Sequence, residues 1–370
     1  DLLDDPDIDA IIVSGLMTST NNNNAARTAA RAVGKIIAGL VNPSAHLVDQ
    51  WDRDMTADPT WQNFGDNFQM DSTNLYSYED GTPTGNHGRQ GNGGNGLRGI
   101  EYEEGIYLGY KYYETYWAET IAGRTDASAN VTPNSPENIA AADLWWNKHV
   151  AFPFGFGLSY TTFDFKITGV YTDASRGNKI ANDAVLNGSL FASSVGIPAL
   201  VKTLYVSVLV KNTGDVAGKT AVQIYATAPY IMNGIEKSFV SMVGFDKTIQ
   251  LQPGGSQTVT VPVQVQDISS FDYNDANGNG NEGYELDPGE YVLHAMRTSH
   301  VDEEASDYAK FSFSIGGVDA VNLKLDDYTD NLIEPLFSDP TTDDYTIREG
   351  INADPLAKMT IMSRSDFDGT

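Results

Sequence analysis

The stretch TLYVSVLVKNTG, residues 203–214, alternates apolar and polar side chains and ends in a turn signal. A period of two places the apolar side chains on one face of a strand. The pattern recurs in TAVQIYATAP (220–229), SQTVTVPVQV (256–265) and EYVLHAMRT (290–298), with turn signals such as QPGG (252–255) between the stretches. Several short strands at this spacing predict an antiparallel β-sandwich.

The beginning of the chain has a different pattern. A short apolar run over residues 8–13 predicts a buried strand of a parallel sheet, and apolar side chains at near-helical spacing follow over 25–37 and stop before Gly39. Because a strand and a helix are only half of a βα unit, we expect the first domain to begin upstream of Asp1. Further along, residues 100–117 predict a strand that continues into a helix or a turn.

The stretch AFPFGFGLSYTTF, residues 151–163, lies where the helical patterns give way to the strand patterns. It alternates large aromatic side chains with proline and glycine, and it contains no acid, base, thiol or metal ligand. Aromatic faces separated by glycines let another backbone approach closely. We therefore predict that this stretch packs the two parts of the chain together, and direct contact with a substrate is the alternative.

Composition excludes several classes of function. The 370 residues include 50 acidic and 23 basic side chains, a formal net charge of -27, which repels phosphate backbones and anionic membranes. Nucleic acid and membrane partners are therefore not expected, whereas a neutral carbohydrate is unaffected. The absence of cysteine excludes disulfides, zinc–thiolate sites and cysteine nucleophiles from these residues.

Seven motifs follow one another along the chain: NPSAHLVDQW (42–51), DPTWQNFG (58–65), EYEEGIYLGYKYYET (101–115), FPFGFGLSYTTF (152–163), VKNTGDVAGKTAVQIY (210–225), VGFDKTIQLQPGGSQTVTV (243–261) and LDPGEYVLH (286–294). This series resembles glycoside hydrolase family 3. The chain departs from the family pattern at Ala45, where NPSG has glycine, and at Lys111, where arginine is usual.

The resemblance implies a fold class of α/β plus all-β. Residues 1–157 correspond to the C-terminal part of an α/β sandwich domain, and residues 158–318 correspond to a fibronectin type III-like, immunoglobulin-like β-sandwich. Residues 319–370 are expected to form an extended connector toward a barrel domain that this chain lacks. Residues 328–337 and 359–370 resemble the connector of permuted family members, in which the barrel follows the sandwich. The usual order with an unusual tail is the alternative.

The resemblance also implies part of a retaining exo-β-glycosidase that removes terminal β-linked glucose or xylose from an oligosaccharide or glycoside. The family's aspartate nucleophile and glutamate acid/base belong to motifs that do not occur in these residues, so we expect the chain alone to be inactive. No organic cofactor is implied. A homo-oligomer is compatible with the resemblance, and the absence of cysteine fits either a bacterial cytoplasm or an exported bacterial protein, with an extracellular or cell-surface location favoured. A non-catalytic carbohydrate-binding or adhesion module is the alternative from another class.

Three residues are candidates for contact with a sugar: Trp61, His87 and Glu103. Glu103 and Glu104 are adjacent, and neighbouring side chains of a strand point to opposite faces, so they cannot flank one glycosidic bond as a catalytic pair. The glycine-rich residues 85–99 lack the Gly-Lys-Ser/Thr ending of a phosphate-binding loop and predict a surface or active-site loop.

One loop resembles the first half of an EF-hand calcium loop. Asp275, Asn277 and Asn279 have its spacing, and Gly280 stands at the sixth position. The acid stands one place early, at the eleventh position. The candidate calcium ligands are Asp275, Asn277, Asn279 and Glu285. A polar hairpin insertion without a metal is the alternative.

Overall fold

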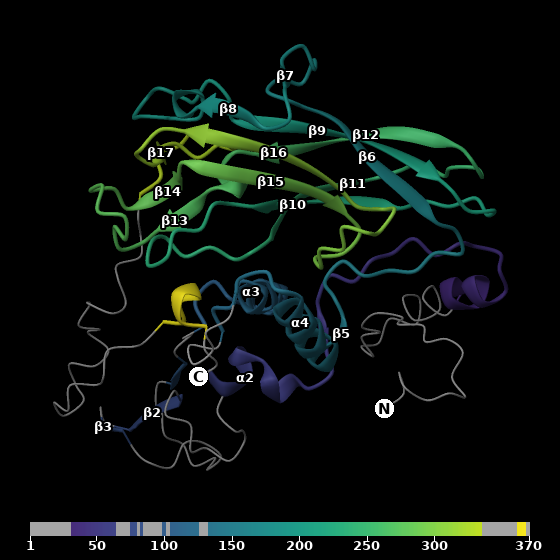
Figure 1. Ribbon diagram of the computed structural model, residues 1–370, viewed down its shortest axis with the longest axis horizontal. Coiled ribbons are helices and arrows are strands. Elements are labelled where there is room, and N and C mark those ends of the chain that lie inside the picture. Colours follow the sequence, from purple (N-terminus) through teal and green to yellow (C-terminus); the bar gives the residue numbers. More distant parts are fainter. Residues whose placement is uncertain are drawn as a thin grey trace.

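The computed structural model describes residues 31–63, 75–79, 82–83, 98–100, 104–125, 132–334 and 361–367. A β-sandwich forms the upper layer in Figure 1, and helices α3 (Tyr110–Ile121) and α4 (Pro136–His149) lie beneath it. The final described segment, 361–367, lies beside α3 (Figure 1).

The sandwich consists of two packed sheets. The first has the order β11-β10-β15-β16-β8 and the second has the order β12-β9-β6-β7. Neighbouring strands are antiparallel except for β16 and β8, which are parallel. The strands are β6 (Phe163–Tyr171), β7 (Lys179–Ile180), β8 (Ala184–Asn187), β9 (Thr203–Asn212), β10 (Ala221–Thr227), β11 (Ser241–Lys247), β12 (Ser256–Gln264), β15 (Gly289–Met296) and β16 (Ala309–Gly316).

The four alternating stretches of the sequence form β9, β10, β12 and β15, which confirms the predicted β-sandwich. In β9 the side chains of Leu204, Val206, Val208 and Val210 are fully buried, and they join one core cluster with side chains of the opposite sheet. Burying each such side chain contributes about 1.5–3 kcal/mol to folding. The alternation of apolar and polar residues in the sequence therefore reflects the core between the two sheets, which buries every second side chain.

Smaller elements surround the sandwich. One end carries a three-stranded sheet of β13 (Ser270–Asp272), β14 (Gly283–Leu286) and β17 (Val321–Leu323), so β17 lies within the residues assigned to the connector. The other elements are β1 (Trp51–Asp52), α2 (Pro59–Asn63), β2 (Leu75–Glu79), β3 (Thr82–Pro83), β4 (Arg98–Ile100), β5 (Val150–Phe152) and the 3-10 turns Met55–Ala57, Gly188–Leu190, Gln266–Ile268 and Arg364–Asp366.

The first part of the chain combines helices with short strands, in agreement with the α/β part of the predicted fold class. Residues 31–37 are helical, within the helix predicted over 25–37, and α3 forms where a helix or turn was expected. Ser135 caps α4 by accepting a hydrogen bond from the Asn138 N–H at 3.2 Å. The strand predicted at 8–13 lies outside the described residues.

The stretch 151–163 packs the two parts together, as predicted. Phe154 stacks on Tyr110 of α3 at 4.7 Å between ring centroids, and the Gln223 amide of β10 donates to the Gly155 carbonyl at 3.1 Å. Gly155 has a φ of 80°, and a Cβ there would lie 2.2 Å from the Gln223 side-chain oxygen. A Cβ on Gly157 would lie 2.3 Å from the carbonyl oxygen of Ala45. Glycine is thus required for this close approach.

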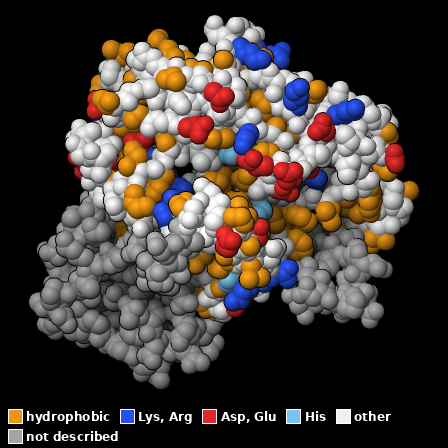
Figure 2. Space-filling model, viewed as in Figure 1, with side chains coloured by type: hydrophobic (Ala, Val, Ile, Leu, Met, Phe, Trp, Pro, Cys, Tyr) orange, Lys and Arg blue, Asp and Glu red, His pale blue; other side chains and the backbone are white. Residues whose placement is uncertain are grey.

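The charged side chains on the face shown in Figure 2 are dispersed, with Lys and Arg lying among acidic and apolar side chains. None of the helices in the described part of the chain is both long enough and apolar enough to cross a membrane.

Candidate functional site

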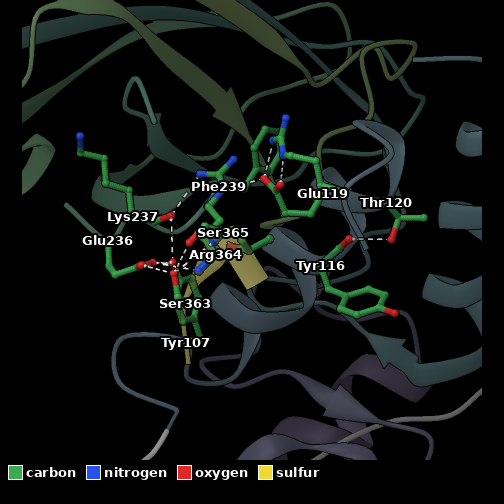
Figure 3. A network of polar contacts seen from close by, with 12 residues as sticks. Tyr107, Tyr116, Glu119, Thr120, Glu236, Lys237, Phe239, Ser363, Arg364 and Ser365 are labelled. Carbon is green, nitrogen blue, oxygen red and sulfur yellow. Dashed lines mark hydrogen bonds and ion pairs between the residues drawn. The ribbon is translucent and has the colours of Figure 1, made fainter. Parts of the chain in front are cut away.

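A network of polar contacts surrounds Arg364 in the segment 361–367 (Figure 3). Its guanidinium is buried and donates from Nε to the Glu119 carboxylate of α3 at 2.6 Å and from one terminal nitrogen to the Lys237 carbonyl at 3.1 Å. The guanidinium carbon also lies 4.4 Å from the centre of the Tyr230 ring. These contacts join the segment to α3 and to the loop before β11.

Glu119 is fully buried and binds two guanidinium groups. Arg124 donates to both of its carboxylate oxygens, and Arg364 donates to one of them. The hydrogen bond to Glu119 raises the pKa of Arg124. A buried carboxylate requires such partners, because removing its charge from water costs several kcal/mol. Both oxygens of the Glu119 carboxylate therefore bind arginine side chains, one of which belongs to the segment 361–367.

Glu236 holds the backbone of the same segment. Its carboxylate accepts from the Ser363 hydroxyl at 2.6 Å, from the Arg364 N–H at 3.0 Å and from the Tyr107 hydroxyl. Tyr107 is fully buried, and burial raises its pKa well above the usual range, with the Glu236 charge adding to the effect. Tyr107 therefore remains a neutral donor to Glu236.

An aromatic contact fixes the end of the segment. Phe367 is buried, with its ring edge-on to Tyr107 at 4.8 Å and stacked with Tyr112 at 5.7 Å between centroids. Tyr107 and Tyr112 come from the turn before α3 and from its first turn. Polar and apolar contacts thus dock residues 363–367 as one unit.

A polar pocket of about 220 Å³ borders this docked unit. Its lining includes Asn233, Glu236, Asp272, Ser363 and Ser365. The pocket is smaller than the roughly 300–1,000 Å³ typical of small-molecule sites. The Glu236 carboxylate on its wall is already bound by protein donors, whereas one oxygen of the buried Asp272 carboxylate has no hydrogen-bond partner among the described residues.

Other buried charges are also paired within the protein. Glu114 of α3 accepts from the Ser299 hydroxyl at 2.8 Å and lies 3.0 Å from the His300 ring nitrogen, while Lys237 pairs with Asp287. Burial lowers the pKa of Lys237, and the hydrogen bond to Asp287 opposes that shift. A retaining glycosidase needs two carboxyl groups that face the sugar. These carboxylates instead bind the protein's own side chains.

The candidate sugar contacts are only partly covered by the structure. Trp61 lies half-buried in α2, and the Asp58 carboxylate caps that helix at the Thr60 N–H. His87 and Glu103 lie outside the described residues. Their contact with a sugar therefore stays a prediction. Glu104, beside Glu103, is buried.

Three of the four candidate calcium residues contact one another: Asn277 and Asn279, in the loop between β13 and β14, both donate to Glu285 of β14. Asp275, in the same loop, accepts from the Gly280 N–H. In the described part of the chain, no group of three or more His, Cys, Asp or Glu side chains is placed to hold a metal ion. Calcium binding by this loop stays a prediction.

Sequence reasoning missed the docking of residues 363–367. Two signals point toward it: α3 carries Glu114 and Glu119 among aromatic residues, and Arg364 and Phe367 stand three residues apart in an otherwise polar segment. Buried acids need cationic or hydroxyl partners, and such pairs suggest a contact without identifying the partner.

Part of the sandwich matches a known family. Residues 220–299 match the fibronectin type III-like domain. The sandwich is a fibronectin type III-like domain. Relatives extend the similarity beyond it. β-Glucosidase A of Butyrivibrio fibrisolvens is 28% identical over 280 residues, covering 75% of this chain and 25% of the relative. β-Glucosidase of Ruminococcus albus is 31% identical over 194 residues, covering 52% of this chain and 14% of the relative.

Fungal proteins match as well as bacterial ones. The probable β-glucosidase G of Aspergillus flavus is 38% identical over 172 residues, covering 41% of this chain and 20% of the relative. Among solved structures, β-glucosidase 3B from Thermotoga neapolitana in complex with α-D-glucose matches with 25% identity and a TM-score of 0.47, covering 79% of this chain and 27% of that chain. The chain thus spans a quarter or less of the curated relatives described, and it is similar to part of a family 3 β-glucosidase.

Proposed function

We propose that this chain is part of a retaining exo-β-glycosidase of the β-glucosidase or β-xylosidase type. The whole enzyme would hydrolyse terminal β-linked glucose or xylose through a covalent intermediate, with the nucleophile and the acid/base supplied from outside this chain. The observation that carries the proposal is the match to a β-glucosidase over 280 residues. Since the fibronectin type III-like match covers only 220–299, the likeness includes the helical part as well.

The proposal divides the chain into three parts. Residues 1–157 are the end of an α/β sandwich domain, residues 158–318 are the fibronectin type III-like domain, and residues 319–370 are a connector toward a barrel. The docking of Arg364 and Phe367 supports a fixed connector, because it holds the segment beside α3. A barrel attached after this segment would begin next to the α/β part, where a shared active site is needed.

The substrate contacts in this proposal come from the first part of the chain. Trp61 would stack on a sugar ring, and His87 and Glu103 would donate and accept hydrogen bonds at its hydroxyl groups. The catalytic carboxylates would belong to segments outside residues 1–370. In this division the buried Glu114 and Glu119 of α3 bind protein side chains, and the catalytic role belongs to carboxylates elsewhere.

The test compares the 370-residue chain with the complete parent protein on a panel of nitrophenyl β-glycosides. We expect turnover of β-glucoside or β-xyloside by the parent and none by the chain alone. A Glu103→Gln, Glu104→Gln double variant of the chain serves as the control. Turnover by the chain that the double variant loses would show that the catalytic residues lie here, against the proposal.

A non-catalytic carbohydrate-binding or adhesion module is the second candidate. The β-sandwich alone favours it, because such sandwiches are used in many binding proteins. It predicts that the parent protein is inactive on the whole panel while the chain binds cellulose or xylan in a sedimentation assay. The similarity outside residues 220–299 favours the enzyme.

A further inference from the structure

The loop between β13 and β14 is closed by its own side-chain oxygens. The Asp275 carboxylate accepts from the Gly280 N–H at 3.0 and 3.1 Å. Asn277 Oδ1 accepts from the Asn279 N–H at 3.1 Å, and Asn279 Oδ1 accepts from the Asn281 N–H at 2.8 Å. The oxygens of alternate residues therefore lie on the inside of one tight turn. Each amide oxygen retains a second lone pair that these hydrogen bonds do not use.

Three asparagine amides converge on one buried carboxylate, that of Glu285 in β14. Asn277 Nδ2 donates to it at 2.6 Å, Asn279 Nδ2 donates at 2.9 and 3.1 Å, and Asn281 Nδ2 donates as well. Glu285 is fully buried. All three donors are neutral amides, so this ring does not balance the carboxylate's charge. A buried, unbalanced carboxylate is costly unless a cation is available.

The Asn281 side chain gives a further indication that the loop can bind a cation. Asn281 is 5% exposed, and its buried Oδ1 has no hydrogen-bond partner among the described residues. This oxygen belongs to the same amide group that faces Glu285. Rotating an amide by half a turn exchanges its oxygen and nitrogen with little change of shape. In the rotated orientation the Asn281 oxygen and the Glu285 carboxylate both present oxygens to a cation, which would bind each at about 2.3–2.6 Å.

We propose that this loop binds a calcium ion through side-chain oxygens, after the Asn281 amide rotates. The proposed ligands are Asp275, Asn277, Asn279, Asn281 and Glu285. Calcium accepts six to eight oxygen ligands in flexible geometry, including amide carbonyls, whereas magnesium prefers six ligands with near-ideal angles and retains water. Amide oxygens at irregular positions therefore favour calcium.

The amide-rich ligand set also sets the strength of binding. Only Asp275 and Glu285 bring negative charge, and affinity in such loops falls as the number of charged ligands falls. We expect a dissociation constant of about 10⁻⁴–10⁻³ M, in the range of extracellular modules. Because Glu285 lies in β14 and the other ligands lie in the loop, the ion would tie the loop to the small sheet at the end of the sandwich.

The experiment follows the melting temperature of the 370-residue chain in 0, 0.1, 1 and 10 mM calcium chloride, with magnesium chloride as the ion control. At about ten times the dissociation constant we expect a rise of roughly 2–5 °C in calcium. Terbium luminescence sensitised by Tyr284, next to Glu285, reports binding separately. The Asp173→Asn variant is a matched control, since Asp173 closes an exposed turn elsewhere, accepting from the Asn178 N–H at 2.7 Å.

Two variants distinguish a calcium site from a clamp without metal, in which hydrogen bonds from the asparagine amides to Glu285 alone hold the loop. Glu285→Gln should abolish the calcium shift and the terbium signal. Asn279→Asp adds a charged ligand, so it should lower the calcium concentration at half-saturation at least fivefold. In a clamp without metal, Asn279→Asp would put two carboxylates together and lower the melting temperature equally with and without calcium. That result, or no calcium shift in the unaltered chain, would overturn the proposal.

Discussion

Replacing Arg364 with methionine should release the segment 361–367 from α3. Methionine keeps much of the length and the apolar contact of the side chain but removes the charge and all of its donors. The structure shows what is lost: the hydrogen bond to Glu119 at 2.6 Å, the hydrogen bond to the Lys237 carbonyl at 3.1 Å and the position over the Tyr230 ring. Arg124 remains on Glu119, so that carboxylate keeps one cationic partner.

The magnitude follows from these contacts. A hydrogen bond to a charged group contributes about 1.5–3 kcal/mol, and a desolvated cation–π contact adds about 0.5–2 kcal/mol. Two such hydrogen bonds and the cation–π contact together contribute about 3.5–8 kcal/mol to the free energy of docking. At about 1.4 kcal/mol for each factor of ten, the docking equilibrium should fall by about 300-fold or more.

Hydrogen exchange measured by mass spectrometry tests this loss. The backbone N–H of residue 364 donates to Glu236 at 3.0 Å only when the segment is docked. In the Arg364→Met variant this N–H should exchange faster, by the same factor by which the docking equilibrium falls. The matched control is Arg176→Met, because Arg176 is exposed in a turn on the sandwich. Unchanged exchange in the Arg364→Met chain, or equal acceleration in the control, would refute the reasoning.

Two further predictions concern the junction and the sandwich core. Gly155→Ala should lower the free energy of unfolding by about 2–5 kcal/mol in denaturant unfolding, because residue 155 has a φ of 80° and the new Cβ would lie 2.2 Å from the Gln223 side-chain oxygen. The control is Gly254→Ala, which has a φ of 73° but no atom within 4 Å of the new Cβ, and which should cost only about 1–2 kcal/mol. Burial lowers the pKa of His294 from 6.5 to about 4, so the unfolded chain binds a proton that the folded chain does not bind between these pH values. Stability should therefore fall from pH 7 to pH 4.5 by about 2–3 kcal/mol through this residue, and a His294→Gln variant should lose that share in urea midpoints compared at the two pH values.

The sandwich could be predicted from the sequence because its cause is local. In β9, a period of two places Leu204, Val206 and Val208 on the buried face, and neighbouring residues suffice to show it. The packing role of 151–163 could also be predicted, since the alternation of aromatics and glycines is visible in the sequence. The contact partners of this stretch could not be predicted, because Gly155 lies against Gln223, which is in β10 and far along the chain.

The docking of residues 361–367 could not be predicted, because its charged side chains pair with residues that are far away in the sequence. Arg364 and Glu119 are separated by 245 residues, and nothing in either local sequence identifies the other. The tryptophans show the same limit. Trp145 and Trp146 could stack on a sugar by residue type, yet Trp145 stacks on Tyr116 at 4.1 Å and Trp146 stacks on His300 at 4.0 Å. Residue type indicates an aromatic contact, and only the fold decides its partner.

The loop that carries the proposed ion site also borders the pocket beside the docked segment. Asp272 at the end of β13 and Asn274 and Ala276 in the β13–β14 loop line this pocket together with Ser363 and Ser365. An ion that fixes this loop would fix one wall of the pocket beside Ser363 and Ser365, without contacting Arg364 or Glu119. Calcium should then slow exchange at the docked segment in the unaltered chain but not in a chain with Glu285→Gln. The β13–β14 loop of the sandwich would in that case help to fix the position of residues 363–367 beside α3.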